Sequence, residues 1–415
     1  MLEKGAHGVG SEAFDWWRDV HWMAPLQQLL SAVERVSCLH PLAIVARKRL
    51  DIAFFPDISR AVGVSLKAMF VPGASGDDIR EECVLSVSRA WVSSADGSGS
   101  ASPVNRLQKP CSHGDGRPVP SDTDSAASDA APSENNVAPF LSVRTAFDLY
   151  LKVLALPRGS RVVCSALTIP NMVEIFEEHG LAPLPVDLNP DTLAPEPGAL
   201  ELEVEKHGTG DGVDDDNGGR VRAIYVAHVF GAQVDIGPIA EAARRHGLLL
   251  WEDCAQVFTG RQGYLGHPGS DAVFWSFGVI KRATALGGGV VRIRDTDILS
   301  AMQREEAEYP SQSATAYLRR VFKCSMLLAC TSPLLFGILV HLLGLLGIDH
   351  DKVVMKLSHG FPKKGMLKAI RQRPSIPLLQ MLAWRIGRYT SEGVERRLRN
   401  CNRMLRLLDR ALPRQ

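Results

Sequence analysis

The sequence has almost no net charge and no paired cysteine motif. Its 47 basic and 46 acidic residues give a formal net charge of +1 at pH 7, so neither a basic field for nucleic acid nor an acidic tail is expected. The eight cysteines include no C-x-x-C pair and no zinc-type histidine spacing. The start, MLEKGAHGVGSEAFDWWRDV, lacks the basic-then-apolar order of a secretory signal. These absences argue against nucleic-acid-binding, zinc-binding and secreted proteins and predict a cytoplasmic protein with reduced thiols.

What the chain does contain is enough apolar sequence for a large core. Its 415 residues are 45% hydrophobic and 22% charged, which allows two domains or one large domain with additions. We predict an N-terminal helical segment over 1–92 and a large α/β domain over 139–300. A mainly helical portion would follow over 301–415. Residues 93–138 are rich in Ser, Asp, Ala, Gly and Pro, which predicts a disordered insert.

Helix-like and strand-like patterns alternate through the middle of the chain. Residues 142–154 have helical spacing and lead to a strand at RVVCSAL, and the strand VRAIYVA precedes the helix IGPIAEAARRHG. Such alternation predicts a mostly parallel sheet flanked by helices. Residues 203–220 are expected to be a polar loop, and Asp214–Asp216 lack the spaced ligands of a calcium site.

The stretch 248–294 carries the most informative chemistry. One apolar run stops at Asp253, and a second, Ala272–Phe277, delivers Lys281 a few residues before three glycines. A partly desolvated lysine with a strand-end aspartate suits pyridoxal phosphate (PLP), in which lysine forms a Schiff base and the acid pairs with the pyridinium nitrogen. The alternatives are a helix-capping or loop aspartate and a solvated turn lysine.

Three segments together resemble one enzyme family. Residues 141–193, 221–256 and 270–291 are similar in order, spacing and motif type to the DegT/DnrJ/EryC1/StrS aminotransferases. The resemblance implies PLP-dependent fold type I, with a mostly parallel seven-stranded sheet flanked by helices and a smaller C-terminal helical or α+β portion. It also implies a homodimer with PLP at the subunit interface, and a small domain completed beyond the present C-terminus. The implied reaction moves an amino group from an amino acid such as glutamate to a nucleotide-linked keto sugar, as in polysaccharide biosynthesis.

The resemblance also assigns roles to individual residues. Lys281 would hold the cofactor and move the proton, and a lysine rather than a histidine here favours transamination over dehydration. Asp253 would pair with the ring nitrogen. The remaining cofactor contacts would come from Gln256 near the ring 3-oxygen, from Ser276, Thr145 and Ala146 as phosphate donors, and from His228 beside the cofactor region.

Two positions depart from the family pattern. Val143 and Arg144 stand where a phosphate loop usually has Gly and Thr; Arg144 either grips the phosphate with its guanidinium or is a surface arginine. Ile169 stands where the family commonly has an aromatic residue that stacks on the ring. The alternatives to an aminotransferase are another PLP-dependent lyase and a catalytically degenerate, membrane-attached scaffold.

An apolar segment distinguishes the C-terminal portion. Residues 324–348 contain no Asp, Glu, Lys or Arg, as in a membrane helix. Pro333 and His341 favour instead two buried or dimer-interface helices broken at Thr331–Pro333, with membrane contact as the alternative. The final stretch predicts a basic amphipathic helix that docks on the protein or touches an anionic membrane.

Overall fold

The computed structural model describes residues 76–92, 133, 135–209, 219–260, 263–330, 333–348, 365–390 and 392–411. All of them belong to one compact unit that spans Ala61–Gln415. Most of the expected N-terminal helical segment, most of the expected disordered insert and the three aspartates at 214–216 lie outside the described residues. The N-terminal segment is represented by helix α5, Gly76–Val92.

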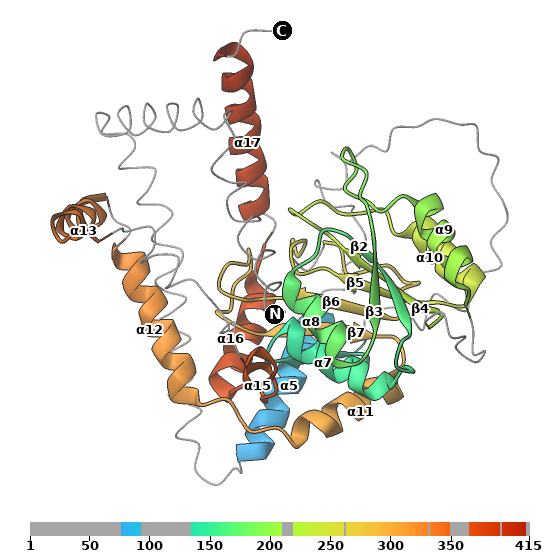
Figure 1. Ribbon diagram of the computed structural model, residues 1–415. Coiled ribbons are helices and arrows are strands. Elements are labelled where there is room, and N and C mark those ends of the chain that lie inside the picture. The colour runs from blue at the N-terminus through green and yellow to red at the C-terminus, as the bar shows by residue number, and fades with distance from the viewer. Residues whose placement is uncertain are drawn as a thin grey trace, which may run out of the picture. The chain divides into compact units, whose positions relative to one another are not determined.

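A seven-stranded sheet forms the centre of this unit (Figure 1). Its order is β1-β7-β6-β5-β4-β2-β3. Neighbouring strands are parallel, except that β7 runs antiparallel to both β1 and β6. The strands are β1 Val137–Phe140, β2 Arg161–Ser165, β3 Ala182–Val186, β4 Val221–Ala227, β5 Leu249–Asp253, β6 Ala272–Ser276 and β7 Gly289–Ile293. The mostly parallel seven-stranded sheet is thus confirmed.

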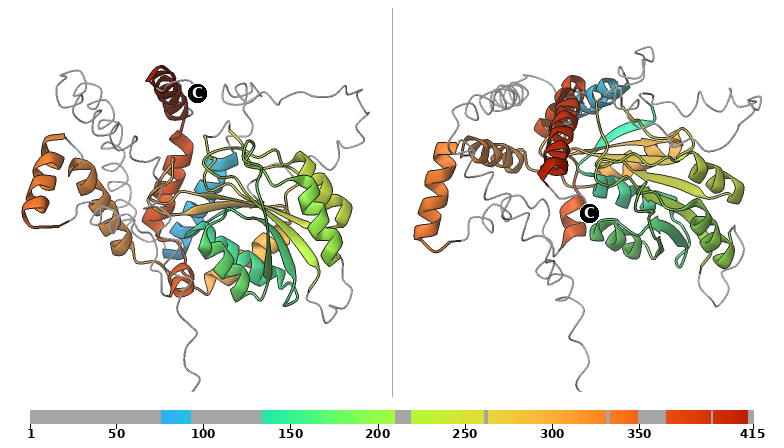
Figure 2. Two further views of the ribbon diagram at one scale, coloured as in Figure 1. Left: turned by 45° about the horizontal axis from the view of Figure 1, so that its top comes forward. Right: turned by 90° about the horizontal axis from the view of Figure 1, so that it is seen from above.

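Helices cover both faces of the sheet (Figure 2). One face is buried by α7 Val143–Leu154, α8 Pro170–Glu178, α11 Thr296–Ala307 and α15 Met366–Ile370. The other is buried by α9 Pro197–His207 and α10 Gly237–His246. On that second face α5 packs along α16, Ile376–Arg388. The remaining described helices are α12 Ala314–Cys330, α13 Pro333–Leu345 and α17 Glu392–Ala411.

Aromatic side chains hold α7 against the sheet. Phe147 is fully buried, and its ring lies 5.4 Å from that of Phe274 on β6 and 5.7 Å from that of Trp251 on β5. The next residue along β6, Trp275, points to the opposite face, where its ring lies 4.6 Å from Trp91 of α5. Alternating aromatics in one strand therefore fix helices on both faces.

The structure corrects two boundaries. Residues 203–207, expected in a polar loop, form the end of α9, because Leu200 and Val204 lie one helical turn apart and are both buried against the sheet. The strand β1 begins at Val137, inside the expected disordered insert, because this residue pairs with Arg292 of β7.

The apolar segment is two helices, as expected from its proline. The helix α12 ends at Cys330 and α13 begins at Pro333. The side chains of α13 whose exposure the structure describes are half-exposed or exposed, so the described part of the chain does not bury this helix. Among the described helices, none combines the length and the apolar character that spanning a bilayer requires.

We expect Phe147→Ala to lower the free energy of unfolding by about 3–5 kcal/mol, because it leaves a large cavity among the buried aromatic rings. Phe322→Ala is the matched control: that side chain is 67% exposed, so its truncation should cost less than about 0.5 kcal/mol. Urea denaturation followed by circular dichroism measures both. Equal losses in the two variants would contradict the described core.

Candidate functional site

A cavity of about 600 Å³ lies where β5 and β6 end and α7 begins. Carboxyl ends of parallel strands meet at one edge of a sheet, where α/β proteins usually bind ligands. Five segments supply the polar side chains: the start of α7, the helix α8, the end of β5, the end of β6 with the turn that follows it, and α12. These side chains are Ser142, Arg144, Asn171, Glu174, Asp253, Ser276, Lys281 and Arg320.

Asp253 is the last residue of β5, and its carboxylate is fixed from two sides. One oxygen accepts a hydrogen bond of 2.8 Å from the Tyr225 hydroxyl, and the other accepts one of 2.9 Å from the Ala255 backbone N–H. Burial, together with the negative charge of Asp253, raises the pKa of Tyr225 well above its ordinary value, so this phenol stays a donor. Asp253 therefore presents a pre-oriented carboxylate to the cavity.

Lys281 lines the same cavity and is partly desolvated. Burial lowers the pKa of its ammonium group; the charge of Asp253 opposes this effect and that of Arg144 adds to it. The turn that carries Lys281 is closed by the Phe277 carbonyl, which accepts hydrogen bonds from the Ala285 and Gly287 backbone N–H groups. The neutral fraction of the Lys281 amine is therefore increased, and the amine lies close enough to Asp253 for the carboxylate charge to affect its pKa.

The glycines after this turn bring β7 against the start of α7. A Cβ on Gly289 would lie 2.6 Å from the backbone nitrogen of Val143, closer than real contacts allow, so only glycine fits. The Gly288 N–H donates to the Leu141 carbonyl at 3.0 Å. The glycine run thus passes close to the start of α7, which places Arg144 on the cavity wall.

The helix α12 closes the cavity from the side of the lysine turn. The Tyr317 hydroxyl donates to the Ala285 carbonyl at 2.8 Å, and the Arg320 guanidinium donates to the Leu286 carbonyl at 3.1 Å. Tyr317 is buried, whereas Arg320 lines the cavity. A second arginine, after Arg144, thus faces the cavity from a helix that follows the lysine turn.

A smaller cavity of about 310 Å³ adjoins the first and shares Ser276, Lys281 and Ile169 with it. Gln256 lines this second cavity, and its side-chain oxygen accepts a 3.0 Å hydrogen bond from the Phe230 N–H. Gln256 thus lies near Lys281 but on the other side of it from Arg144. Ile169 stands where an aromatic ring was expected to stack, and it is partly exposed to both spaces.

Three expected cofactor contacts lie away from both cavities. Thr145 is fully buried: its N–H donates to the Ser142 hydroxyl and its own hydroxyl donates to the Ile370 carbonyl. Ala146 is fully buried, with its N–H bound to the Ser142 carbonyl. The N–H groups of Thr145 and Ala146, which were expected to bind a phosphate, thus donate to the residue that caps the helix instead. His228 is also buried, beneath the site.

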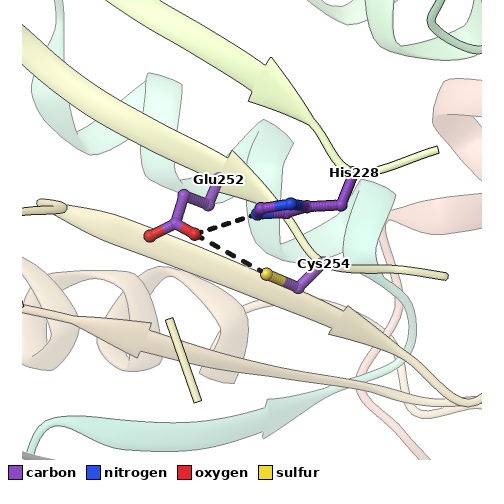
Figure 3. A group of neighbouring side chains, drawn as sticks. All are labelled: His228, Glu252 and Cys254. Carbon is purple, nitrogen blue, oxygen red and sulfur yellow. Dashed lines mark hydrogen bonds and ion pairs between the residues drawn. The ribbon is translucent and has the colours of Figure 1, made fainter. Parts of the chain in front are cut away.

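His228 belongs to a buried group with Glu252 and Cys254 (Figure 3). Its Nδ1 accepts from the Val234 N–H, so its Nε2 carries the hydrogen donated to Glu252 at 3.0 Å. Burial acts to raise the Glu252 pKa, but hydrogen bonds from His228, Ser270 and Tyr264 hold it below its ordinary value.

The donor atoms of this group lie within 4.8 Å of one another, as a metal site requires. However, the Glu252 carboxylate already accepts hydrogen bonds from His228, Tyr264, the His267 N–H and Ser270. These bonds join the ends of β4 and β5 to the loop before β6, and they fix the backbone directly beside Asp253.

Sequence reasoning missed three residues of the site. Tyr225 could have been found once β4 and β5 were paired, because it lies two residues before Ala227, the register partner of Asp253. Glu174 lines the cavity from α8, where a charged helix residue usually indicates a solvated face. Arg320 gave no signal, since nothing in the sequence of α12 links it to the lysine turn.

Comparisons with known proteins find one matching family model and similar curated proteins. Residues 134–313 match the model of the DegT/DnrJ/EryC1/StrS aminotransferase family. Over 161 residues the chain is 30% identical to GDP-perosamine synthase of Caulobacter vibrioides and 31% identical to dTDP-3-amino-3,4,6-trideoxy-alpha-D-glucose transaminase of Micromonospora megalomicea subsp. nigra. Each match covers 38% of this chain and 40% of the relative, so the chain spans well under half of these proteins.

Two solved structures are similar to part of this chain. The aminotransferase TlmJ of Streptoalloteichus hindustanus is 21% identical, with a TM-score of 0.37 over 44% of this chain and 47% of that one. The sugar aminotransferase CalS13 of Micromonospora echinospora is 24% identical, with a TM-score of 0.35 over 44% and 50%. The likeness to the DegT/DnrJ/EryC1/StrS aminotransferase family is thus carried by residues 134–313, and this segment contains both Asp253 and Lys281.

Proposed function

We propose that this protein is a PLP-dependent aminotransferase that transfers an amino group from an amino acid such as glutamate to a nucleotide-linked keto sugar. The observation that carries the proposal is that Lys281 and Asp253 line one cavity. Both named relatives are enzymes of amino-sugar nucleotides. A role in polysaccharide biosynthesis follows as part of the same proposal.

The residues around the cavity fit PLP. An amine with a lowered pKa and an oriented carboxylate are the two groups that this cofactor needs at its aldehyde and its ring nitrogen. Arg144 and the Ser276 hydroxyl line the same cavity and suit a phosphate. The space, about 600 Å³, lies within the range of cofactor sites.

Each polar group then has a defined task. Lys281 would hold the cofactor covalently, Asp253 would keep its ring nitrogen protonated, and Arg144 with Ser276 would bind its phosphate. Gln256 lies on the far side of Lys281 and would approach the ring 3-oxygen. When bound, PLP supplies an electron sink for the substrate's α-carbon. The Lys281 amine would move the proton at that carbon, and its lowered pKa increases the neutral fraction that can accept it.

The substrate side of the cavity offers one further cation and one acid. Arg320 would attract a phosphate or a carboxylate, and Glu174 would accept hydrogen bonds from sugar hydroxyls.

A homodimer is part of this proposal, because the cavity is open and a second copy can complete its wall. Contact with a membrane through residues 324–348 is proposed as well. Thr145, Ala146 and His228 would act by supporting the walls rather than by touching the cofactor.

We expect covalent capture of PLP to depend on one lysine. After incubation with PLP and reduction with borohydride, mass spectrometry should find the added mass on the peptide that contains Lys281. Lys281→Ala should abolish this signal, because no other amine lines the cavity among the described residues. Lys206→Ala, at an exposed lysine of α9, is the control and should leave capture unchanged. Equal incorporation into the two variants would contradict the site.

The charges around Lys281 predict opposite shifts of its titration. Burial lowers its pKa, the Arg144 charge lowers it further and the Asp253 charge raises it. The midpoint for reductive methylation of Lys281 without PLP, followed by mass spectrometry against pH, should therefore lie below that of an ordinary lysine. Arg144→Gln should move the midpoint up, and Asp253→Asn should move it down. Shifts in the same direction would refute the arrangement.

Turnover tests the reaction itself. Protein loaded with PLP should release more than one equivalent of 2-oxoglutarate from glutamate only when a nucleotide-linked keto sugar is present to accept the amino group. Lys281→Ala should reduce the rate by about 100- to 10,000-fold, the usual effect of removing a general base. Breakdown of the amino acid without a keto sugar would indicate a lyase. PLP capture without any turnover would indicate a degenerate binding protein.

A further inference from the structure

The residues that follow the segment similar to the aminotransferase family include an apolar stretch that extends away from the core. Residues 324–348 contain no charged residue. Apart from His341, the helix α13 within this range has the sequence PLLFGILVHLLGL, which is apolar on every side. Its exposed side chains include Ile338, Leu342 and Leu345, the last of them 71% exposed. Helices that are apolar all round are stable when buried in protein or in lipid, and α13 is not buried by the described part of this chain.

Both ends of this apolar segment are fixed to the core. Before it, Tyr317 and Val321 of α12 are buried, and Tyr317 is bonded to the lysine turn. After it, Met366 and Ile370 of α15 are buried in the main core. The chain therefore leaves the core and returns to it. A segment held at both ends can enter an apolar phase and come back, but it cannot end on the far side of a bilayer.

The length of α13 agrees with a shallow entry. Its 13 residues extend about 20 Å, less than the roughly 30 Å of hydrocarbon in a bilayer. The break between Cys330 and Pro333 separates it from α12, so the segment consists of the end of one helix followed by a second, short helix. We name residues 324–348 the apolar segment.

The sequence on either side of the apolar segment is basic. The cations are Arg319, Arg320 and Lys323 before it and Lys352, Lys356, Lys363 and Lys364 after it, against the acids Asp349 and Asp351. Cations at the boundary of an apolar segment attract anionic lipid headgroups. Arg319 and Lys323 are exposed on α12 and are available for this contact.

We propose that the apolar segment docks this protein on an anionic lipid bilayer by entering one leaflet. A second copy of the chain fits the observations less well, because a helix pair buries one stripe of each partner and would leave the opposite apolar side of α13 in water. Lipid surrounds such a helix on every side. Docking is independent of the proposed aminotransferase reaction, since Lys281 and Asp253 lie outside the apolar segment.

Vesicle flotation of the full chain tests the proposal. The protein should float with vesicles that contain phosphatidylserine and less with vesicles of phosphatidylcholine alone. Leu345→Glu should reduce the bound fraction about tenfold or more, because it replaces an apolar contact with a charge. Leu202→Glu is the matched control: this leucine is 62% exposed on α9 and should float like the wild type. Lys323→Glu should weaken binding to the anionic vesicles selectively.

Other outcomes separate the alternatives. If the wild-type protein does not float, or if Leu345→Glu floats as the wild type does, lipid docking through the apolar segment is wrong. If Leu345→Glu instead converts a dimer to a monomer in light scattering without changing flotation, a second copy covers α13. PLP capture at Lys281 should be the same in Leu345→Glu and wild type, which keeps this test separate from that of the reaction.

Discussion

The site depends on one hydrogen-bonded carboxylate at the end of β5. Asp253 is held by a buried phenol and a backbone N–H, and both donors come from elements that the sheet itself fixes. Because Tyr225 sits on the neighbouring strand in parallel register, the orientation of the carboxylate follows from strand pairing. The charge of Asp253 then acts on Lys281 across the cavity, so the sheet controls the chemistry of the lysine.

Buried hydrogen bonds next to Asp253 hold the backbone of β5 in place. Glu252 points to the opposite side of β5 from Asp253, and there it gathers hydrogen bonds from His228, Tyr264 and Ser270. A saturated buried carboxylate is costly to disturb, since removing one donor leaves it partly unpaired. Adjacent residues of one strand therefore have different roles: Asp253 faces the cavity, and Glu252 fixes the strand through its buried hydrogen bonds.

The elements that the sequence predicted are those with strong local signals. The helix 142–154 and the strands that end at Ala227 and Asp253 follow from periodicity, and Asp253 and Lys281 were identified from their positions after apolar runs. Phosphate donors at Thr145 and Ala146 could not be judged from sequence. Whether a helix start offers its N–H groups to a ligand or to its own cap depends on the Ser142 rotamer, which is a property of the fold.

The positions of the remaining site residues depend on packing between segments that are distant in sequence. Arg320 and Tyr317 reach the lysine turn from α12, a helix that begins beyond the region of family similarity. The same helix leads directly into the apolar segment. Hydrogen bonds from Tyr317 and Arg320 of this helix to the carbonyls of Ala285 and Leu286 connect it to the loop that carries Lys281. This wall of the cavity is therefore held by a helix outside the residues matched to the family, which is why the motif around Lys281 could not reveal it.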